Sequence, residues 1–445
     1  MKTLSGTLLL AAASAVLPAQ QPGSIALHGA RVFTVSGPVL NKGTVLLRDG
    51  LIEAVGEDID LPKDAWVIDA TGLSVYPGLI DSLSTVGLPE TPQQTPPPRA
   101  SAEPPFGRQE TPMPLEQGPE LRPFTTSWVR AADVVNPGDH RIAETRSAGF
   151  TSVAAFPSAG IFAGEGALLN LSGEKAGRMI VASPTGQYLT LATRGFGTYP
   201  GSLMGVLAYI RQLSLDADYY RLAIQNYDKH PSGHKRPVYD RASEGLLESP
   251  RLLFPADTPV QVDRMLRFAA GLTRPAVLYG GHGAYRVADH VARASIPMLV
   301  SLKWPERPKD PDPDEEETFR ALEMRDRAPS APAELRRQGA LFAFYSGGVA
   351  PKDIRKAVRR AIGAGLSEAD AVRAFTLSAA QIYGLADRLG SIEAGKIANL
   401  VITKGGLFDE KSTVEYVLID GVKYSPVPGT KTGDGQGRAT SGGIR

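Results

Sequence analysis

Short hydrophobic runs with the alternation typical of β-strands occupy both ends of the chain. Near the N-terminus two such runs flank Asp49-Gly50, and near the C-terminus two more flank Asp420-Gly421. An Asp-Gly pair between β-rich runs favours a hairpin, because both turn residues need a positive φ angle. Neither end is long enough to bury a core alone. We therefore predict that residues 20–76 and 388–425 pair as one small composite β-sandwich domain.

Between these ends, strand-like and helix-like runs alternate. Residues 252–257 are typical of a short buried strand, 260–270 of the helix that follows it, and 275–279 of the next strand. Residues 352–364 carry apolar side chains at i, i+3, i+4, i+7 and i+8, which indicates a helix with one buried face. Repeated alternation of this kind favours an α/β fold with a parallel barrel. A (β/α)8 TIM-like barrel uses about 250 residues, so we predict one over residues 77–387.

Three segments stand outside this alternation. Residues 1–19 combine Lys2, a short apolar run and a small residue before Gln20, a pattern that predicts a secretory signal peptide and a secreted or periplasmic protein, with a buried helix as the alternative. Residues 89–123 are dense in proline and cannot continue a helix or a central strand, so they form either a long loop over the barrel mouth or a disordered linker. Residues 426–445 have almost nothing to bury, and we expect a disordered tail.

Composition narrows the chemistry. The formal net charge of +1 provides no electrostatic basis for binding nucleic acid or an anionic membrane. The absence of cysteine excludes disulfides, thiolate catalysis and lipidation at a cysteine. No run after the signal peptide reaches the roughly 18 apolar residues of a transmembrane helix, so we expect a soluble mature protein with no membrane contact after signal cleavage.

Residues 77–81, Pro-Gly-Leu-Ile-Asp, resemble the opening of the first barrel strand in the amidohydrolase superfamily, the metal-dependent (β/α)8-barrel hydrolases. Residues 280–289 resemble the sixth-strand segment of the imidazolonepropionase-like branch, and residues 374–396 resemble the closing segment of that branch and of dihydroorotase-like members. The resemblance covers most of residues 24–424. It implies hydrolysis of carbon-nitrogen bonds other than peptide bonds, with zinc or another divalent metal as the cofactor.

The resemblance also assigns metal-ligand positions, and this chain departs from the family at each of them. The two His of the first strand correspond to Leu83 and Thr85, the His of the fifth strand to Pro255, and the Asp of the eighth strand to Gly347. A bound metal lowers the pKa of water from 15.7 to about 7, so its loss removes roughly 12 kcal/mol of nucleophile activation. We therefore expect no cofactor and a catalytically degenerate member, which acts as a binding or partner protein for a small-molecule ligand, as a homo-oligomer or paired with an intact relative.

The alternative is an active amide or cyclic-amide hydrolase with an unusual site around His282, in which Asp257 and Lys303 take part. His282 follows the sixth predicted strand, although a single histidine is more often a hydrogen-bonding pocket residue. Asp257 has a plain alternative as the cap of the helix that follows it. Asp81, Ser84 and Ser346 are further residues expected at the barrel mouth, where Asp81 has a structural interpretation. His230 and His234 have the i, i+4 spacing of a metal-binding pair, but residues 231–233, Pro-Ser-Gly, break the helix that would align them, so we expect a surface loop, with metal binding as the alternative. The other histidines have no neighbouring ligands: His28, His140 and His290.

Overall fold

The computed structural model describes residues 24–90, 122–173, 175–193, 199–307 and 316–427 of the 445-residue chain. The predicted signal peptide, nearly all of the Pro-rich segment and nearly all of the C-terminal tail lie outside the described residues.

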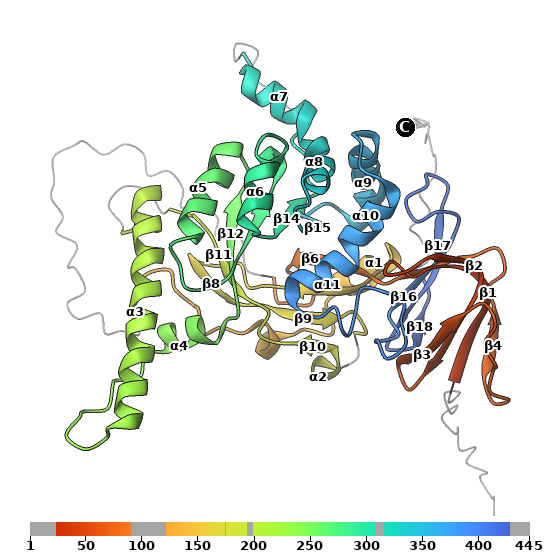
Figure 1. The fold of residues 1–445 in the computed structure, drawn as a ribbon, viewed down its shortest axis with the longest axis horizontal. Helices are drawn as coiled ribbons and strands as arrows, with labels where there is room; N and C mark the ends of the chain where they lie inside the picture. The colour runs from red at the N-terminus through yellow and green to blue at the C-terminus, as the bar shows by residue number, and fades with distance from the viewer. Residues whose placement is uncertain (1–23, 91–121, 174, 194–198, 308–315, 428–445) are drawn as a thin grey trace, which may run out of the picture.

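Strands from both ends of the chain share one eight-stranded sheet, in the order β18-β17-β16-β5-β1-β2-β3 with β4 beside β1 (Figure 1). The junction is the antiparallel pairing of β5 with β16, in which Tyr76 faces Val401. The residues of both Asp-Gly turns have positive φ angles, as predicted. The predicted pairing of the two ends is therefore present, while their arrangement as a sandwich stays a prediction. The strands are β1 (Ser24–Phe33), β2 (Val39–Arg48), β3 (Leu51–Gly56), β4 (Trp66–Asp69), β5 (Ser74–Pro77), β16 (Leu400–Lys404), β17 (Thr413–Ile419) and β18 (Val422–Tyr424).

The remaining strands form two sheets, in the orders β10-β9-β7-β6 and β15-β14-β13-β12-β11-β8. Pairing is parallel between β6 and β7 and from β11 through β15. Only Gly166 separates β8 from β9, so one continuous segment joins the two sheets. The strands are β6 (Leu79–Ser84), β7 (Phe150–Ala155), β8 (Phe162–Glu165), β9 (Ala167–Asn170), β10 (Ile180–Ala182), β11 (Gln187–Leu189), β12 (Leu252–Ala256), β13 (Ala276–Gly280), β14 (Met298–Ser301) and β15 (Phe342–Tyr345).

The two sheets meet a second time where β15 lies beside β6, and there the described residues form no backbone ladder. The backbone N–H of Ser346 instead donates a hydrogen bond to Oδ1 of Asp81 (2.8 Å), and the Tyr383 hydroxyl donates one to the carbonyl of Ser82. The structure therefore has a mixed α/β fold with a parallel arrangement, whereas a fully closed (β/α)8 barrel stays a prediction. This seam between β6 and β15 is where the candidate site lies.

Helices cover the outer faces of the strands (Figure 1). α9 buries Ile354, Ala357, Val358 and Ala361, the face predicted from its apolar period. α7 (Phe319–Arg327) begins at Phe319, because the Thr318 side chain caps it by accepting from the N–H of Ala321. After β13 the chain forms the 3₁₀ segment η2 (His282–Arg286) and then α6 (Ala288–Ala294). None of the described helices is long and apolar enough to cross a bilayer.

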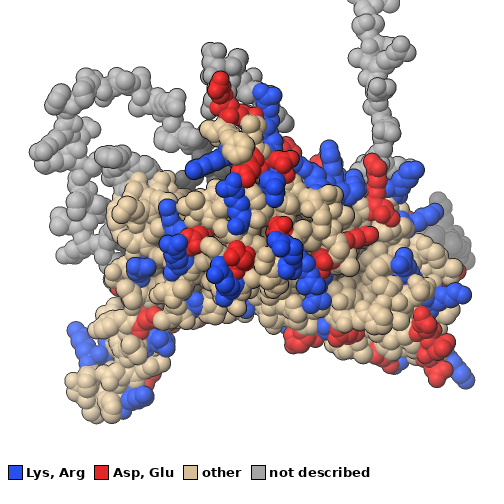
Figure 2. All heavy atoms as spheres, turned by 45° about the horizontal axis from the view of Figure 1, so that its top comes forward, with Lys and Arg blue, Asp and Glu red and all other residues tan. Residues whose placement is uncertain are grey.

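The helices are α1 (Arg141–Ser147), α2 (Ala176–Met179), α3 (Leu203–Lys229), α4 (Arg241–Glu248), α5 (Pro259–Ala269), α6 (Ala288–Ala294), α7 (Phe319–Arg327), α8 (Ala331–Arg337), α9 (Ile354–Gly363), α10 (Glu368–Phe375) and α11 (Leu377–Tyr383). Four 3₁₀ segments accompany them: η1 (Ala131–Val134), η2 (His282–Arg286), η3 (Ala328–Ser330) and η4 (Pro351–Asp353). On the face drawn in Figure 2, basic and acidic side chains are interspersed, in keeping with the small net charge.

A buried network of polar side chains connects the terminal sheet to strands β7 and β9. The Asn399 side-chain amide donates to Asn170 Oδ1 (2.8 Å) and to Ser152 Oγ (3.1 Å), and Asn170 in turn donates to the Asp420 carboxylate (2.8 Å). The backbone N–H of Asp420 closes the network by donating to Asn399 Oδ1 (3.0 Å). Because buried amides are costly when unsatisfied, this network fixes how β16 and the β17–β18 turn sit against β7 and β9.

Candidate functional site

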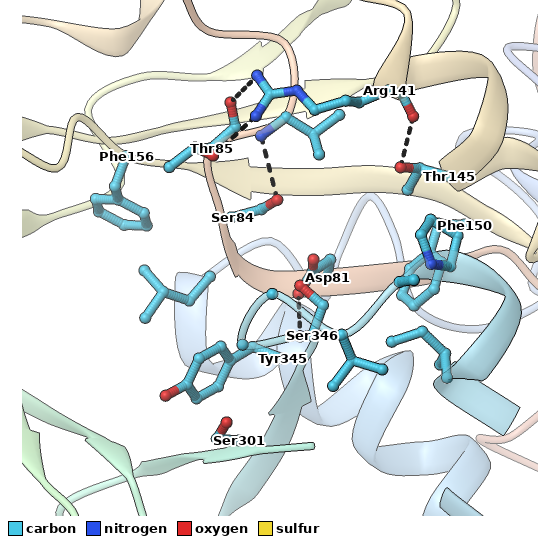
Figure 3. Close-up of a pocket in the computed structure, with 18 of the residues that line it drawn as sticks. Asp81, Ser84, Thr85, Arg141, Thr145, Phe150, Phe156, Ser301, Tyr345 and Ser346 are labelled. Atoms are coloured by element: carbon cyan, nitrogen blue, oxygen red, sulfur yellow. Dashed lines mark hydrogen bonds between the residues drawn. The ribbon is translucent and has the colours of Figure 1, made fainter. Parts of the chain in front are cut away.

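A cavity of about 600 Å³ opens at the seam between β6 and β15, at the C-terminal ends of the parallel strands (Figure 3). This is the end of a parallel α/β barrel at which active sites are found. β6 contributes Asp81, Leu83 and Ser84 to its wall, and β14 and β15 contribute Ser301 and Tyr345. Its aromatic lining is completed by Phe150, Phe156, Tyr188 and Tyr279.

Asp81 lies at the buried end of this cavity with 3% of its surface exposed. Burial raises its pKa to about 6, even though the N–H of Ser346 donates to Oδ1 and favours the charged form. Within the described part of the chain no Lys, Arg or His forms an ion pair with it. A carboxyl group with a raised pKa in a concave site is a candidate functional group as well as a structural one.

Three tyrosines form the wall on the side of β11, β13 and β15. The rings of Tyr188 and Tyr279 lie 5.1 Å apart between centroids, and Phe156 lies 6.0 Å from Tyr188. The Tyr279 hydroxyl donates to the carbonyl of Leu189 (2.8 Å), which directs that hydroxyl into the wall. Burial raises the pKa of Tyr188, Tyr279 and Tyr345 above the usual value of tyrosine, so all three are neutral phenols at physiological pH.

The residues at the first-strand ligand positions do not suit a metal ion. Leu83 offers no donor atom. The Thr85 hydroxyl accepts a hydrogen bond from Nη1 of Arg141 (3.2 Å), and Nη2 of the same guanidinium donates to the Thr85 carbonyl (3.0 Å). Arg141 is itself paired with Asp139 at 2.7 Å. A guanidinium cation therefore occupies the rim at the second ligand position (Figure 3).

The other two ligand positions are equally unsuitable. Pro255 on β12 has a side chain without lone pairs. Gly347 has a φ angle of +61°, and a Cβ atom at this position would lie 2.3 Å from Ser301 Oγ, so an aspartate cannot be accommodated without displacing Ser301. No group of three or more His, Asp or Glu residues suited to a metal ion is found among the described residues. The donor set does not fit the metal that the resemblance implies, and we derive no step through one.

His282, Asp257 and Lys303 line a second cavity of about 940 Å³ next to the first. Nδ1 of His282 lies 2.8 Å from Oδ1 of Asp257, and Nε2 lies 3.1 Å from the carbonyl oxygen of Ser301. Both ring nitrogens therefore lie within hydrogen-bond distance of an oxygen atom of the protein. Burial acts to raise the pKa of Asp257, but hydrogen bonding and the charge of His282 outweigh it and hold that pKa below its ordinary value. Lys303 is exposed at the edge of this cavity.

The sequence interpretation of Asp257 as a helix cap is wrong. The Thr258 hydroxyl caps α5 by accepting a hydrogen bond from the backbone N–H of Gln261. In turn the backbone N–H of Thr258 donates a hydrogen bond to Oε1 of Gln261. This capping box leaves the Asp257 carboxylate available to His282. The geometry therefore brings Asp257 and His282 into contact, with Lys303 in the same cavity.

The remaining histidines lie away from both cavities. His230 ends α3 and His234 lies in the loop beyond it, as the sequence indicated. His28 contacts the Thr44 hydroxyl. The expectation that His140 and His290 have no neighbouring ligands is wrong, because Asp139 lies 3.8 Å from Nδ1 of His140. For His290, Asp263 lies 3.4 Å from Nδ1 and Asp289 lies 3.8 Å from Nε2. These two carboxylates contact opposite sides of the ring, so they cannot share one ion with it.

Sequence reasoning missed Arg141, Tyr188 and Tyr279 as site residues. Arg141 reaches Thr85 across 56 positions of the chain, and β11, which carries Tyr188, is only three residues long. An aromatic residue directly before Gly280-Gly281 at the end of a strand was the one available signal, for Tyr279.

Comparisons with known proteins show similarity to amidohydrolases. Residues 322–424 match the family model described as "Amidohydrolase family". The crystal structure of an amidohydrolase from Thermotoga maritima MSB8 is similar over 91% of this chain and 100% of that one, with a TM-score of 0.73 and 26% identity. A Xaa-Pro dipeptidase with methionine bound in its active site matches over 90% of this chain and 100% of its own, with a TM-score of 0.51 and 15% identity, which shows likeness of fold alone.

A curated dihydroorotase from Anaeromyxobacter dehalogenans (strain 2CP-C) is 40% identical over 55 residues, which are 12% of this chain and 13% of that relative. The chain thus matches about an eighth of the length of that protein. Together the family match and the structural neighbours support placement of this chain in the amidohydrolase superfamily.

Proposed function

We propose that this protein is a small-molecule-binding member of the amidohydrolase superfamily that does not use the catalytic metal of the superfamily. The observation that carries the proposal is the occupation of the four ligand-equivalent positions. Leu83, Pro255 and Gly347 provide no side-chain donor, and Thr85 is engaged by Arg141. In our proposal the scaffold is a (β/α)8 barrel whose β6–β15 seam lacks a ladder, accompanied by a β-sandwich built from both ends.

The cavity itself supports a binding role. A volume of about 600 Å³ lies within the usual range for small-molecule sites, which combine mainly apolar walls with a few placed polar groups. Here the walls include Phe156 and three tyrosines, and the polar groups include Asp81 and Ser84. A ligand in this cavity meets both a flat apolar surface and a buried hydrogen-bond acceptor.

The second candidate is an amide or cyclic-amide hydrolase centred on His282, and the contact of His282 with Asp257 at 2.8 Å favours it. An Asp-His pair can hold and move a proton, as general acid-base catalysis requires. Both nitrogens of His282 already face acceptors within the protein, however, so a substrate must displace Asp257 or the Ser301 carbonyl to reach the ring. This arrangement makes the pair a weaker candidate than the mouth cavity.

Our proposals for location and partners rest on the sequence alone. We propose export to a secreted or periplasmic location on the basis of residues 1–19. We also propose that the protein acts as a homo-oligomer or beside an intact relative, without nucleic acid or, after signal cleavage, a membrane as its partner. Detection of the processed N-terminus in exported fractions tests the first point.

The deciding experiment measures metal content and hydrolysis on the same purified protein. We expect less than about 0.1 equivalent of zinc, manganese or iron per chain, and no turnover of amides or lactams. About one equivalent of zinc, with amide hydrolysis that is lost on chelation, would contradict the proposal. Turnover without metal that disappears in His282→Gln but persists in Asp81→Asn would favour the second candidate.

A further inference from the structure

We propose that the mouth cavity binds a small organic cation, with an ammonium or similar group held between the Asp81 carboxylate and the tyrosine rings. This inference rests on the proposed binding function and specifies its ligand class. It depends on three features of the cavity: the placement of charge, the chemistry of the walls, and the hydrogen bonds that are already satisfied.

Charge at the cavity is not balanced among the residues that the structure describes. Asp81 receives the N–H of Ser346 but no ion pair from the described residues. Arg141 is the basic residue in the described wall, and its charge is neutralised by Asp139 at 2.7 Å. The same guanidinium also donates to the carbonyls of Thr85 and Leu88. Glu144 adds a second carboxylate at the rim. The charge left for a ligand is therefore negative.

The walls suit a cation that is partly apolar. The faces of aromatic rings attract positive charge because their quadrupole is negative above the ring. Phe156, Tyr188, Tyr279 and Tyr345 supply four such rings around one cavity. Aromatic cages with a carboxylate are the usual means of holding quaternary ammonium groups, where each good contact contributes about 0.5 to 2 kcal/mol.

Two other ligand classes fit less well. An anion would meet Asp81 and Glu144, and Arg141 already has its partners. A neutral amide could donate N–H groups to Asp81, but it would leave the carboxylate charge uncompensated in a buried position, which is costly. A cation removes that cost by pairing with the charged form of Asp81. A neutral amide is the alternative against which the test is designed.

The experiment compares choline with 3,3-dimethylbutan-1-ol, its isostere in which carbon replaces the charged nitrogen. Both are titrated calorimetrically into the full-length mature protein at pH 7.5. We expect choline to bind at least about tenfold more tightly than the alcohol. Asp81→Asn should lower the affinity for choline by about tenfold and leave the affinity for the alcohol unchanged. Asp58→Asn removes an exposed carboxylate in the loop after β3 and serves as the matched control, which we expect to bind choline like the parent.

A second variant, Tyr188→Leu, keeps the carboxylate and removes one ring, so it should weaken choline severalfold. Equal binding of choline and its isostere, choline affinity unaffected by Asp81→Asn, or no choline binding at millimolar concentration would each overturn the cation inference. Binding of neutral lactams in place of choline would overturn it while leaving the proposed binding function intact. Stoichiometric zinc with amide hydrolysis would instead overturn the proposed function, whatever the choline result.

Discussion

Replacing Asp81 by asparagine should change how the stability of the protein depends on pH. Asparagine has nearly the same shape, and its Oδ1 can still accept the N–H of Ser346. What the substitution removes is a buried group that must ionise as the pH rises. Burial raises the pKa of Asp81 from 3.8 to about 6 in the folded protein. At a pH between these two pKa values, Asp81 is protonated in the folded protein and ionised in the unfolded chain.

The size of the effect follows from this difference. Each tenfold change in proton affinity corresponds to about 1.36 kcal/mol, so ionising Asp81 costs the folded state about 3 kcal/mol once the pH exceeds 6. The folded state binds more protons than the unfolded one across this window, so the parent protein loses this stability as the pH rises from about 4 to 6. Asp81→Asn carries no such loss, and its advantage over the parent should grow by about 3 kcal/mol across the window.

Urea denaturation at pH 4.5, 5.5, 6.5 and 7.5 measures this difference. The variant is compared with the parent at each pH because Glu165, with a pKa raised by burial to about 7, also titrates and contributes equally to both proteins. The groups that face Asp81 from neighbouring elements are Tyr345 and Tyr383. Burial raises the pKa of both phenols above the usual value of tyrosine, so both stay neutral between pH 4.5 and 7.5. A stability difference that is constant between pH 4.5 and 7.5 would refute the assignment of Asp81 as a buried group with a raised pKa.

Four further outcomes are expected. His282→Ala should lower the free energy of unfolding by about 1 to 3 kcal/mol in urea titrations, because it leaves the Ser301 carbonyl without its buried donor. Gly347→Ala should cost about 1 to 3 kcal/mol from overpacking and positive φ, and Ser301→Ala in the same chain should recover part of that loss in thermal melts. Asn399→Ala should cost about 1 to 3 kcal/mol and increase hydrogen exchange in β16 and the β17–β18 turn. Choline affinity should rise as Asp81 ionises near pH 6 and level off above pH 7, as calorimetry at several pH values can measure.

Features of the fold that depend on residues close together in the sequence were predictable from it. The Asp-Gly hairpins required only two residues that accept positive φ, and both turns have it. The buried face of α9 followed from its apolar period. By contrast, β8 and β11 were not predicted, because strands of four and three residues are too short to show a period.

The site depended on contacts between distant residues. That the side chains of Leu83 and Pro255 offer no metal-binding atom follows from the identity of these residues alone. Which residues line the site depends on distances between residues that are far apart in the sequence. Nothing in the sequence indicates that Arg141 reaches Thr85, or that the capping box at Thr258 leaves Asp257 available for His282. Hydrogen bonds over such separations are fixed by tertiary packing, which a local pattern does not record.

The positions expected to bind a metal are occupied by interactions that stabilise a different site. At the second position of the first strand, Arg141 donates two hydrogen bonds to Thr85. At the eighth-strand position, Ser301 Oγ fills the volume that a side chain at Gly347 would need. The carbonyl of that same Ser301 contacts His282, which links the two cavities through one residue of β14. Placing a metal ligand at position 85 or 347 would therefore require Arg141 or Ser301 to change as well. Arg141 and Ser301 also line the cavity in which we propose that Asp81 and the tyrosines bind a ligand, so the residues at two of the four positions are coupled to the wall of that cavity.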